Sequence, residues 1–158
     1  MFNGCSSLIS LNLSNFDTSK VQSMYAMFYD CNNLEYINLK NFKQNQLTSY
    51  DNMFKNVPDN IVVCMNERNT KILSQLKYRK CYTIDCSDDW KLKQKKIISN
   101  NNCIDNCNDD TIYKYEYNGK CVENCTNGDY FDDNNINKCK CELEQCLSCP
   151  PIALKNHL

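Results

Sequence analysis

Apolar residues in the first 65 positions recur with a period of about 26 residues, which indicates an internal repeat. The aligned positions are Met1-Phe2 with Met27-Phe28 and Met53-Phe54, Cys5 with Cys31, and Leu8, Leu11 and Leu13 with Leu34, Ile37 and Leu39. The third copy diverges, because Val57 replaces the cysteine and Ile61-Val62-Val63 occupies the strand position.

Within each unit the spacing of the apolar residues changes. The alternation around Leu11 and Leu13 predicts a short strand with both leucines facing a core. Val21, Met24 and Met27 are then spaced as on a helical turn. One strand and one helical turn per unit predict an α/β solenoid with about 2.5 repeats over residues 1–65, in which each coil contacts only its neighbours.

The string M-F-x-x-C-x-x-L-x-x-L-x-L-x-N-F, which begins at Met1 and returns at Met27 with Ile37 at the second leucine, resembles the BspA-like leucine-rich-repeat surface proteins. The resemblance covers about residues 1–65. It implies a leucine-rich-repeat solenoid in a secreted or membrane-attached protein that takes part in adhesion, and it transfers no catalytic residue.

Polar residues alternate with the apolar ones on the predicted strands, so we expect them to face solvent. A solenoid of this kind presents such a face to partners. The predicted partner-binding face consists of Ser10, Asn12, Ser14, Tyr36, Asn38 and Lys40. Asn12 also begins the glycosylation sequon Asn12-Leu13-Ser14, so it is a candidate glycosylation site.

The chain starts inside a repeat unit, because Met1 occupies the position of Met27 and Met53. Solenoids generally need about three repeats and a cap, so we expect further repeats and a signal sequence upstream. The alternative is a complete small cytosolic solenoid. Cys5 and Cys31 would stack in adjacent coils, either as a disulfide or, the favoured alternative, as a ladder of apolar thiols.

Residues 66–80 contain the amphipathic pattern of Ile72, Leu73 and Leu76, which predicts a helical connector that caps the solenoid. The following basic run from Lys91 to Lys96 predicts a solvated surface segment. We expect Trp90, beside it, to pack between the two modules.

Cysteines dominate residues 81–150, which predicts a small disulfide-rich domain, followed by a tail at 151–158. Asn118-Gly119 after the alternating tyrosines Tyr113, Tyr115 and Tyr117 predicts a hairpin. Disulfides worth about 2–4 kcal/mol each would stabilise so small a core, although spacing does not define their pairing. The cysteines expected to pair among themselves are Cys81, Cys86, Cys103, Cys107, Cys121, Cys125, Cys139, Cys141, Cys146 and Cys149.

Two strings in this domain resemble furin-like and growth-factor-receptor cysteine-rich repeats. They are Tyr117-Asn118-Gly119-Lys120-Cys121-x3-Cys125 and Cys139-Lys140-Cys141-x4-Cys146-x2-Cys149-Pro150. The resemblance, strongest over residues 103–150, implies a rod-shaped extracellular spacer. Zinc is the rival interpretation, because closely spaced cysteine pairs can also form thiolate sites.

Composition argues against most other functions. The net charge of −1 disfavours nucleic acid as a partner, and the chain contains no apolar run long enough to cross a membrane. His157 is the only histidine, so no thiol has a histidine base nearby in sequence. We therefore expect no enzyme, no cofactor and no bound metal.

The sequence predicts an extracellular or cell-surface interaction protein, such as an adhesin or surface antigen. The solenoid would bind a protein or glycan on another cell or host, and the cysteine-rich module would act as a stalk. The alternatives are an intracellular zinc-binding scaffold and a fragment of a receptor-like ectodomain.

Overall fold

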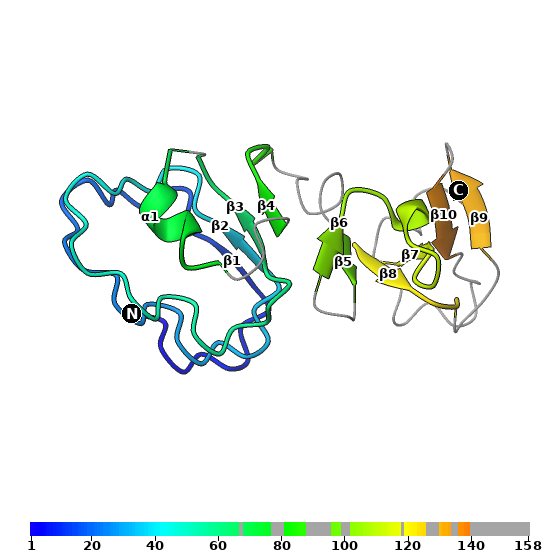
Figure 1. Ribbon diagram of the computed structural model, residues 1–158, viewed down its shortest axis with the longest axis horizontal. Helices are drawn as coiled ribbons and strands as arrows, with labels where there is room; N and C mark the ends of the chain where they lie inside the picture. The colour runs from blue at the N-terminus through cyan, green and yellow to red at the C-terminus, as the bar shows by residue number, and fades with distance from the viewer. Residues whose placement is uncertain are drawn as a thin grey trace.

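The chain forms two β-sheets that follow one another along the long axis of the molecule (Figure 1). The computed structural model describes residues 1–66, 68–76, 81–87, 96–98, 102–117, 119–125, 130–133 and 136–139. Several sequence predictions lie outside these residues: those for Trp90, Cys141, Cys146, Cys149, His157 and the tail at 151–158.

The first sheet is parallel and repeat-like, as the periodicity predicts. Its strands are β1 (Ser10–Asn12), β2 (Tyr36–Asn38), β3 (Val62–Cys64) and β4 (Tyr82–Thr83), in that spatial order. The register pairs Leu11 with Ile37 and Ile37 with Val63, so equivalent repeat positions are neighbours. The sheet therefore extends through β4, past the domain boundary expected at residue 81.

One apolar cluster fills the interior of the coils and runs from Leu13 to Leu76. An aromatic stack follows its length: the ring centroids of Phe2 and Phe28 lie 5.7 Å apart, and those of Phe28 and Phe54 lie 5.4 Å apart. Phe28 is completely buried between its two neighbours. Each coil thus supplies the apolar surface that covers the next one.

The predicted helical turns at residues 21–28 and 47–54 are wrong, because turns and a parallel bridge between Ser23 and Ser49 occupy these segments. In the second coil's turn, alternate N–H groups bond across to the next coil, as when Phe28 donates to the Met53 carbonyl, and others, such as that of Met27, bond only three residues back. Gly4, Asp30 and Asn56, one per coil, share a left-handed backbone with φ of 75°, 60° and 60°. A residue with positive φ cannot continue a right-handed helix, so each turn ends at this position.

The connector after the third coil contains the helix α1 (Thr70–Leu73). It is the only α-helix among the described residues. Ile72 and Leu76 are buried in the solenoid cluster, so this segment covers the third coil.

The second sheet consists of three antiparallel hairpins. They are β5 (Lys96–Ile98) with β6 (Asn102–Ile104), β7 (Tyr115–Tyr117) with β8 (Lys120–Val122), and β9 (Tyr130–Asp133) with β10 (Ile136–Cys139). Parallel pairs β5–β8 and β7–β10 join them into one mixed sheet, which a 3-10 helix, η2 (Cys107–Asp109), adjoins. The hairpin predicted around Gly119 is confirmed as β7–β8.

Four disulfides stabilise this part of the chain: Cys64–Cys86, Cys81–Cys103, Cys107–Cys121 and Cys125–Cys139. The expectation that the ten cysteines from Cys81 onward pair only among themselves is wrong. Cys64, at the end of β3, is buried against the cysteine-rich module and takes Cys86 as its partner.

Cys5 and Cys31 are free thiols in the structure, so the alternative of a disulfide between them is contradicted. Cys31 is buried and its thiol donates a hydrogen bond to the Phe2 carbonyl oxygen at 3.0 Å, whereas Cys5 is exposed. Burial raises the pKa of the Cys31 thiol above its ordinary value of 9.0, which favours its neutral form. The expected ladder of buried thiols is wrong for Cys5, which is exposed.

Candidate binding groove

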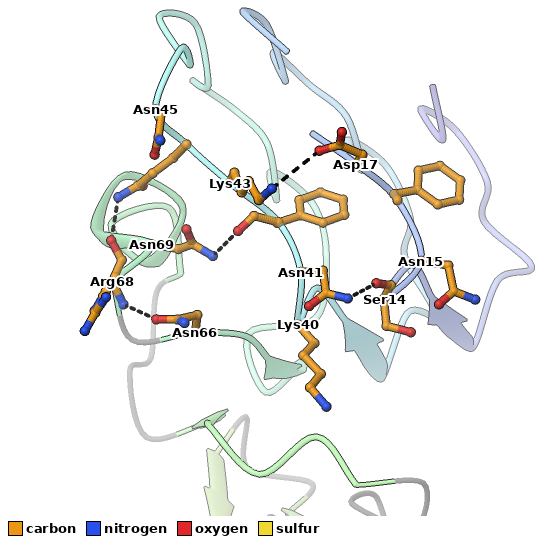
Figure 2. A pocket seen from close by; sticks show the side chains of 13 residues that line it. Ser14, Asn15, Asp17, Lys40, Asn41, Lys43, Asn45, Asn66, Arg68 and Asn69 are labelled. Carbon is orange, nitrogen blue, oxygen red and sulfur yellow. Dashed lines mark hydrogen bonds and ion pairs between the residues drawn. The ribbon is translucent and has the colours of Figure 1, made fainter. Parts of the chain in front are cut away.

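A polar groove of about 510 Å³ crosses the three coils where the chain leaves strands β1, β2 and β3 (Figure 2). The segments that line it follow the carboxyl ends of the parallel strands. Its lining residues are Ser14, Asn15, Phe16, Asp17, Lys40, Asn41, Phe42, Lys43, Gln44, Asn45, Asn66, Arg68 and Asn69.

A repeated asparagine turn creates the groove. The side-chain oxygens of Asn12, Asn38 and Asn66 accept hydrogen bonds from the backbone N–H groups two residues later, at 3.0, 2.9 and 2.9 Å. This local bond bends the backbone out of the extended conformation. Asn12 and Asn38 make the bend at the last residue of their strands, and Asn66 makes it two residues after β3 ends, so the polar segments after it stack next to one another.

Side-chain amides then fix the spacing between these segments. Asn41 donates to the Ser14 carbonyl at 2.6 Å, and Asn69 donates to the Phe42 carbonyl at 2.9 Å. Gln44 likewise donates to the Arg68 carbonyl at 2.6 Å. Figure 2 shows these bonds bridging adjacent coils. The floor of the groove is therefore rigid, and the exposed amides of Asn15 and Asn45 lie at its surface.

Positive charge predominates among the lining residues. Lys40, Lys43 and Arg68 are exposed. Asp17, the one acidic residue among the described lining residues, lies 3.9 Å from the Lys43 ammonium. A hydrogen bond from the Ser19 backbone lowers the pKa of the Asp17 carboxyl below its ordinary 3.8, so this group is ionised at neutral pH. Phe16, 41% exposed, adds an apolar surface.

Only part of the predicted binding face belongs to this groove. Ser14 and Lys40 line it, Asn12 is exposed and Ser10 is partly exposed. The expectation that the whole face is open to solvent is wrong for Tyr36 and Asn38, which are 6% and 5% exposed.

Tyr36 is buried because the cysteine-rich module packs on the outer side of β2 and β3. Its ring joins a cluster with Val62, Cys64 and Ile97, and its hydroxyl donates to the Gly119 carbonyl at 3.0 Å. This burial, with the nearby carboxylates of Glu35 and Glu116, raises the pKa of Tyr36 well above its ordinary 10.0.

Two further contacts tie the module to the solenoid. The amide of Asn60 donates to the Ile98 carbonyl at 2.9 Å, and Lys120 forms an ion pair with Glu35. Because the second pair is half-exposed, it orients the module more than it stabilises it.

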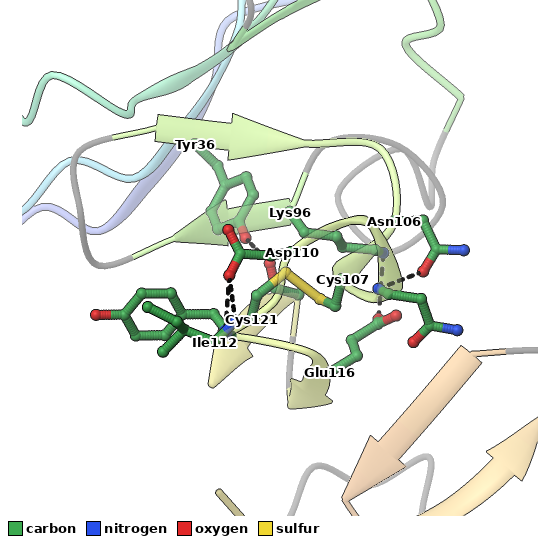
Figure 3. The surroundings of a disulfide bond; sticks show 11 residues. Tyr36, Lys96, Asn106, Cys107, Asp110, Ile112, Glu116 and Cys121 are labelled. Atoms are coloured by element: carbon green, nitrogen blue, oxygen red, sulfur yellow. Dashed lines mark hydrogen bonds and ion pairs between the residues drawn. A yellow bond between two sulfur atoms is a disulfide. The ribbon is translucent and has the colours of Figure 1, made fainter. Parts of the chain in front are cut away.

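A buried ion pair lies within the module itself, near the Cys107–Cys121 disulfide (Figure 3). The Lys96 ammonium lies 3.1 Å from the Glu116 carboxylate, with only 4% and 10% of the side chains exposed. The expectation of a solvated segment is wrong for Lys96, because β5 pairs edge to edge with the second hairpin and the Lys96 side chain is buried there. In the sequence Lys96 cannot be distinguished from the other lysines of the basic run, so its burial could not be predicted.

The described cysteines bear on the zinc interpretation. Eight cysteines are joined in disulfides and so cannot supply the thiolates that the zinc interpretation needs. In the same part of the chain, no group of three histidine, cysteine, aspartate or glutamate residues could hold a metal ion. Nor does that part contain a helix long and apolar enough to span a membrane.

Comparison with curated proteins found no match, and comparison with solved structures found none either. The solenoid does match a known family. Residues 1–75, which include the three coils that form the groove and the helix α1, match the family described as "Mycoplasma protein of unknown function, DUF285".

Proposed function

We propose that this chain is a secreted or cell-surface interaction protein of the BspA-like leucine-rich-repeat type. Its groove binds a protein or glycan ligand on another cell or host, and its cysteine-rich module acts as a stalk. The proposal depends most on one observation: a rigid polar groove spans three coils of a protein whose disulfides suit an oxidising, extracellular compartment.

The lining of the groove favours a polar ligand with negative charge. Exposed amides at Asn15 and Asn45 offer hydrogen bonds, and the surplus of cationic side chains attracts carboxylate or sulfate groups. The exposed ring of Phe16 offers a surface for the apolar face of a sugar or for a protein side chain. Both kinds of ligand fit a groove whose backbone is already fixed by the coil-to-coil amide bonds.

The second sheet supports the role of a stalk. Successive hairpins add to it in order, and β9 and β10 lie farthest from the solenoid in Figure 1. Each of the last two hairpins is fixed by its own disulfide, Cys107–Cys121 and Cys125–Cys139. Such an array of hairpins separates the groove from the surface at the β9–β10 end of the module.

Reversing the positive charge of the groove tests the proposal. The doubly substituted Lys40→Glu, Arg68→Glu variant keeps the fold, since both side chains are exposed. We expect its binding to cultured cells, measured by flow cytometry with the chain purified from an oxidising secretory host, to fall about tenfold or more. The matched control is Lys20→Glu, which reverses an exposed charge outside the groove.

Enzymatic removal of glycans from the target cells distinguishes the two classes of ligand. Loss of binding indicates a glycan, whereas retained binding indicates a protein. If the groove variant and the Lys20→Glu control bind as well as the unchanged chain does, the groove is not the ligand site.

A further inference from the structure

A second cavity, of about 300 Å³, lies where the solenoid meets the cysteine-rich module. Residues of the second and third coils line one side of it, and residues of β5 and β8 line the other. This junction cleft is at the amino ends of β2 and β3, whereas the polar groove follows their carboxyl ends. The two sites share no lining residue, so the junction cleft is separate from the groove.

The walls of the junction cleft are fixed relative to each other. The disulfide Cys64–Cys86 joins the third coil to the module. Asn60, which lines the cleft, donates its side-chain amide to the Ile98 carbonyl of β5 at 2.9 Å. A ligand therefore meets a cavity that is already formed, which lowers the entropic cost of binding.

The charges of the junction cleft are paired. Glu35 and Lys120 are the two charged residues among the described residues that line it, and they form an ion pair with each other. An ionic ligand would lose hydration on entering without gaining an unpaired group of opposite charge. The polar groove differs, because its exposed cations outnumber its one carboxylate. The junction cleft therefore favours a neutral ligand.

Two asparagine amides in the junction cleft have unused hydrogen-bonding capacity. Asn60 is only 8% exposed, and its side-chain oxygen accepts no hydrogen bond from any described residue. The exposed amide of Asn32, at the rim, has no hydrogen-bond partner in the same part of the chain either. A nearly buried acceptor is costly to leave unsatisfied. The ligand that fits this cleft is therefore one that carries hydrogen-bond donors.

Apolar side chains complete the lining. Ile97 is 6% exposed, and Val122 and Pro58 are partly buried. A ring with C–H groups on its face and hydroxyl groups along its edge matches this mixture of apolar and amide surface. The cavity suits a single ring, because its volume is at the lower end of the range of about 300–1,000 Å³ for ligand pockets.

We propose that the junction cleft is a second binding site, which takes one neutral sugar ring. The C–H face of the ring packs on Ile97 and Val122, and its hydroxyl groups bond to the amides of Asn60 and Asn32. Since the solenoid and the module each supply part of the lining, neither region forms the site alone. The site does not depend on the ligand of the polar groove.

Titration with free sugars, followed by saturation-transfer difference NMR, tests this site. The probes are glucose, galactose, mannose and N-acetylglucosamine, added to the whole chain purified from a bacterial periplasm, where disulfides form. At least one should bind saturably in the millimolar range, because a single ring has few atoms for contact. Asn32→Trp fills the exposed rim and should weaken this binding about tenfold or more. Gln46→Trp, a matched change at an exposed amide residue outside both sites, should leave it unchanged.

A charged sugar makes the test specific for the junction cleft. Glucuronate should bind at least about tenfold more weakly than the tightest neutral sugar, because the ion pair leaves no free cation for its carboxylate. Binding of the neutral sugar should be the same in low and in high salt. The proposal is overturned if none of the four neutral sugars binds saturably, if Asn32→Trp binds as well as the unchanged chain, or if glucuronate binds more tightly than they do.

Discussion

The solenoid and the cysteine-rich module solve the same stability problem in different ways. The solenoid buries a continuous apolar cluster along its coils, and two of its three cysteines, Cys5 and Cys31, remain free thiols. Among the described residues of the module, the buried cluster beyond the solenoid contact consists of Ile98, Cys107 and Cys121. Disulfides replace there the apolar area that short strands cannot bury.

The difference follows from how each region repeats. In the solenoid, stacking places each apolar residue on its equivalent, so one coil completes the core of the next. In the module, flat hairpins join edge to edge and enclose little volume, so each needs its own covalent bond. The two regions should therefore respond to different perturbations.

The largest effect is expected from the solenoid core. Phe28→Ala removes a completely buried ring stacked on both sides and should lower the free energy of unfolding by about 3–5 kcal/mol. Phe16→Ala removes the same side chain at a 41% exposed position and should cost far less. Urea denaturation followed by circular dichroism gives both values. Equal losses would show that the aromatic stack contributes no core stability.

Removing one disulfide should produce the next largest effect, and it should be confined to the module. Cys107→Ser with Cys121→Ser opens a loop whose ends are 14 residues apart and should cost about 3 kcal/mol. Hydrogen exchange should rise in β7 and β8 while β2 and β3 stay protected. Cys5→Ser, at an exposed free thiol, is the control and should change nothing. Equal exchange gains in both sheets would contradict the separation of the two regions.

The smallest effect concerns the contact between the two regions. Tyr36→Phe removes the hydroxyl that donates to the Gly119 carbonyl and should cost about 1 kcal/mol at neutral pH. Tyr25→Phe, at a 58% exposed tyrosine, should cost nothing. Urea denaturation measures both changes.

The same tyrosine should make stability depend on alkaline pH. Because its pKa is raised in the folded state, the unfolded chain loses this proton first, so the contribution of Tyr36 to stability is constant below pH 10.0 and falls above it. The part of this fall that belongs to Tyr36 should vanish in Tyr36→Phe but persist in Tyr25→Phe. An identical alkaline fall in both variants would show that Tyr36 is not responsible.

The repeat could be predicted from sequence because its signal is local and periodic. Aligning Leu11 with Ile37 and Val63 was sufficient to predict the order and register of the first three strands. The helical turns were wrong because Val21, Met24 and Met27 have helical spacing, whereas the Met24 N–H bonds across to the next coil and those of Val21 and Met27 bond only three residues back. The spacing of apolar residues indicates which side chains are buried, but it does not indicate the hydrogen-bond partners of the backbone.

The contact between the modules could not be predicted, because it joins residues far apart in the chain. Tyr36 alternates with core residues, so it has the pattern of a solvent-facing strand position until the module covers it. Cys64 has a strand position in the repeat, and nothing near it indicates its partner Cys86. The asparagine turns that shape the groove did have a signal, since Asn12 and Asn38 occupy the same repeat position.

The two disulfides nearest the junction overlap along the chain, because Cys81 lies before Cys86 and each bond spans the other's end. A protease that cuts once anywhere between Cys64 and Cys103 therefore leaves at least one bond across the break. The solenoid stays covalently attached to the cysteine-rich module after such a cut, and separating the two requires reduction as well as cleavage.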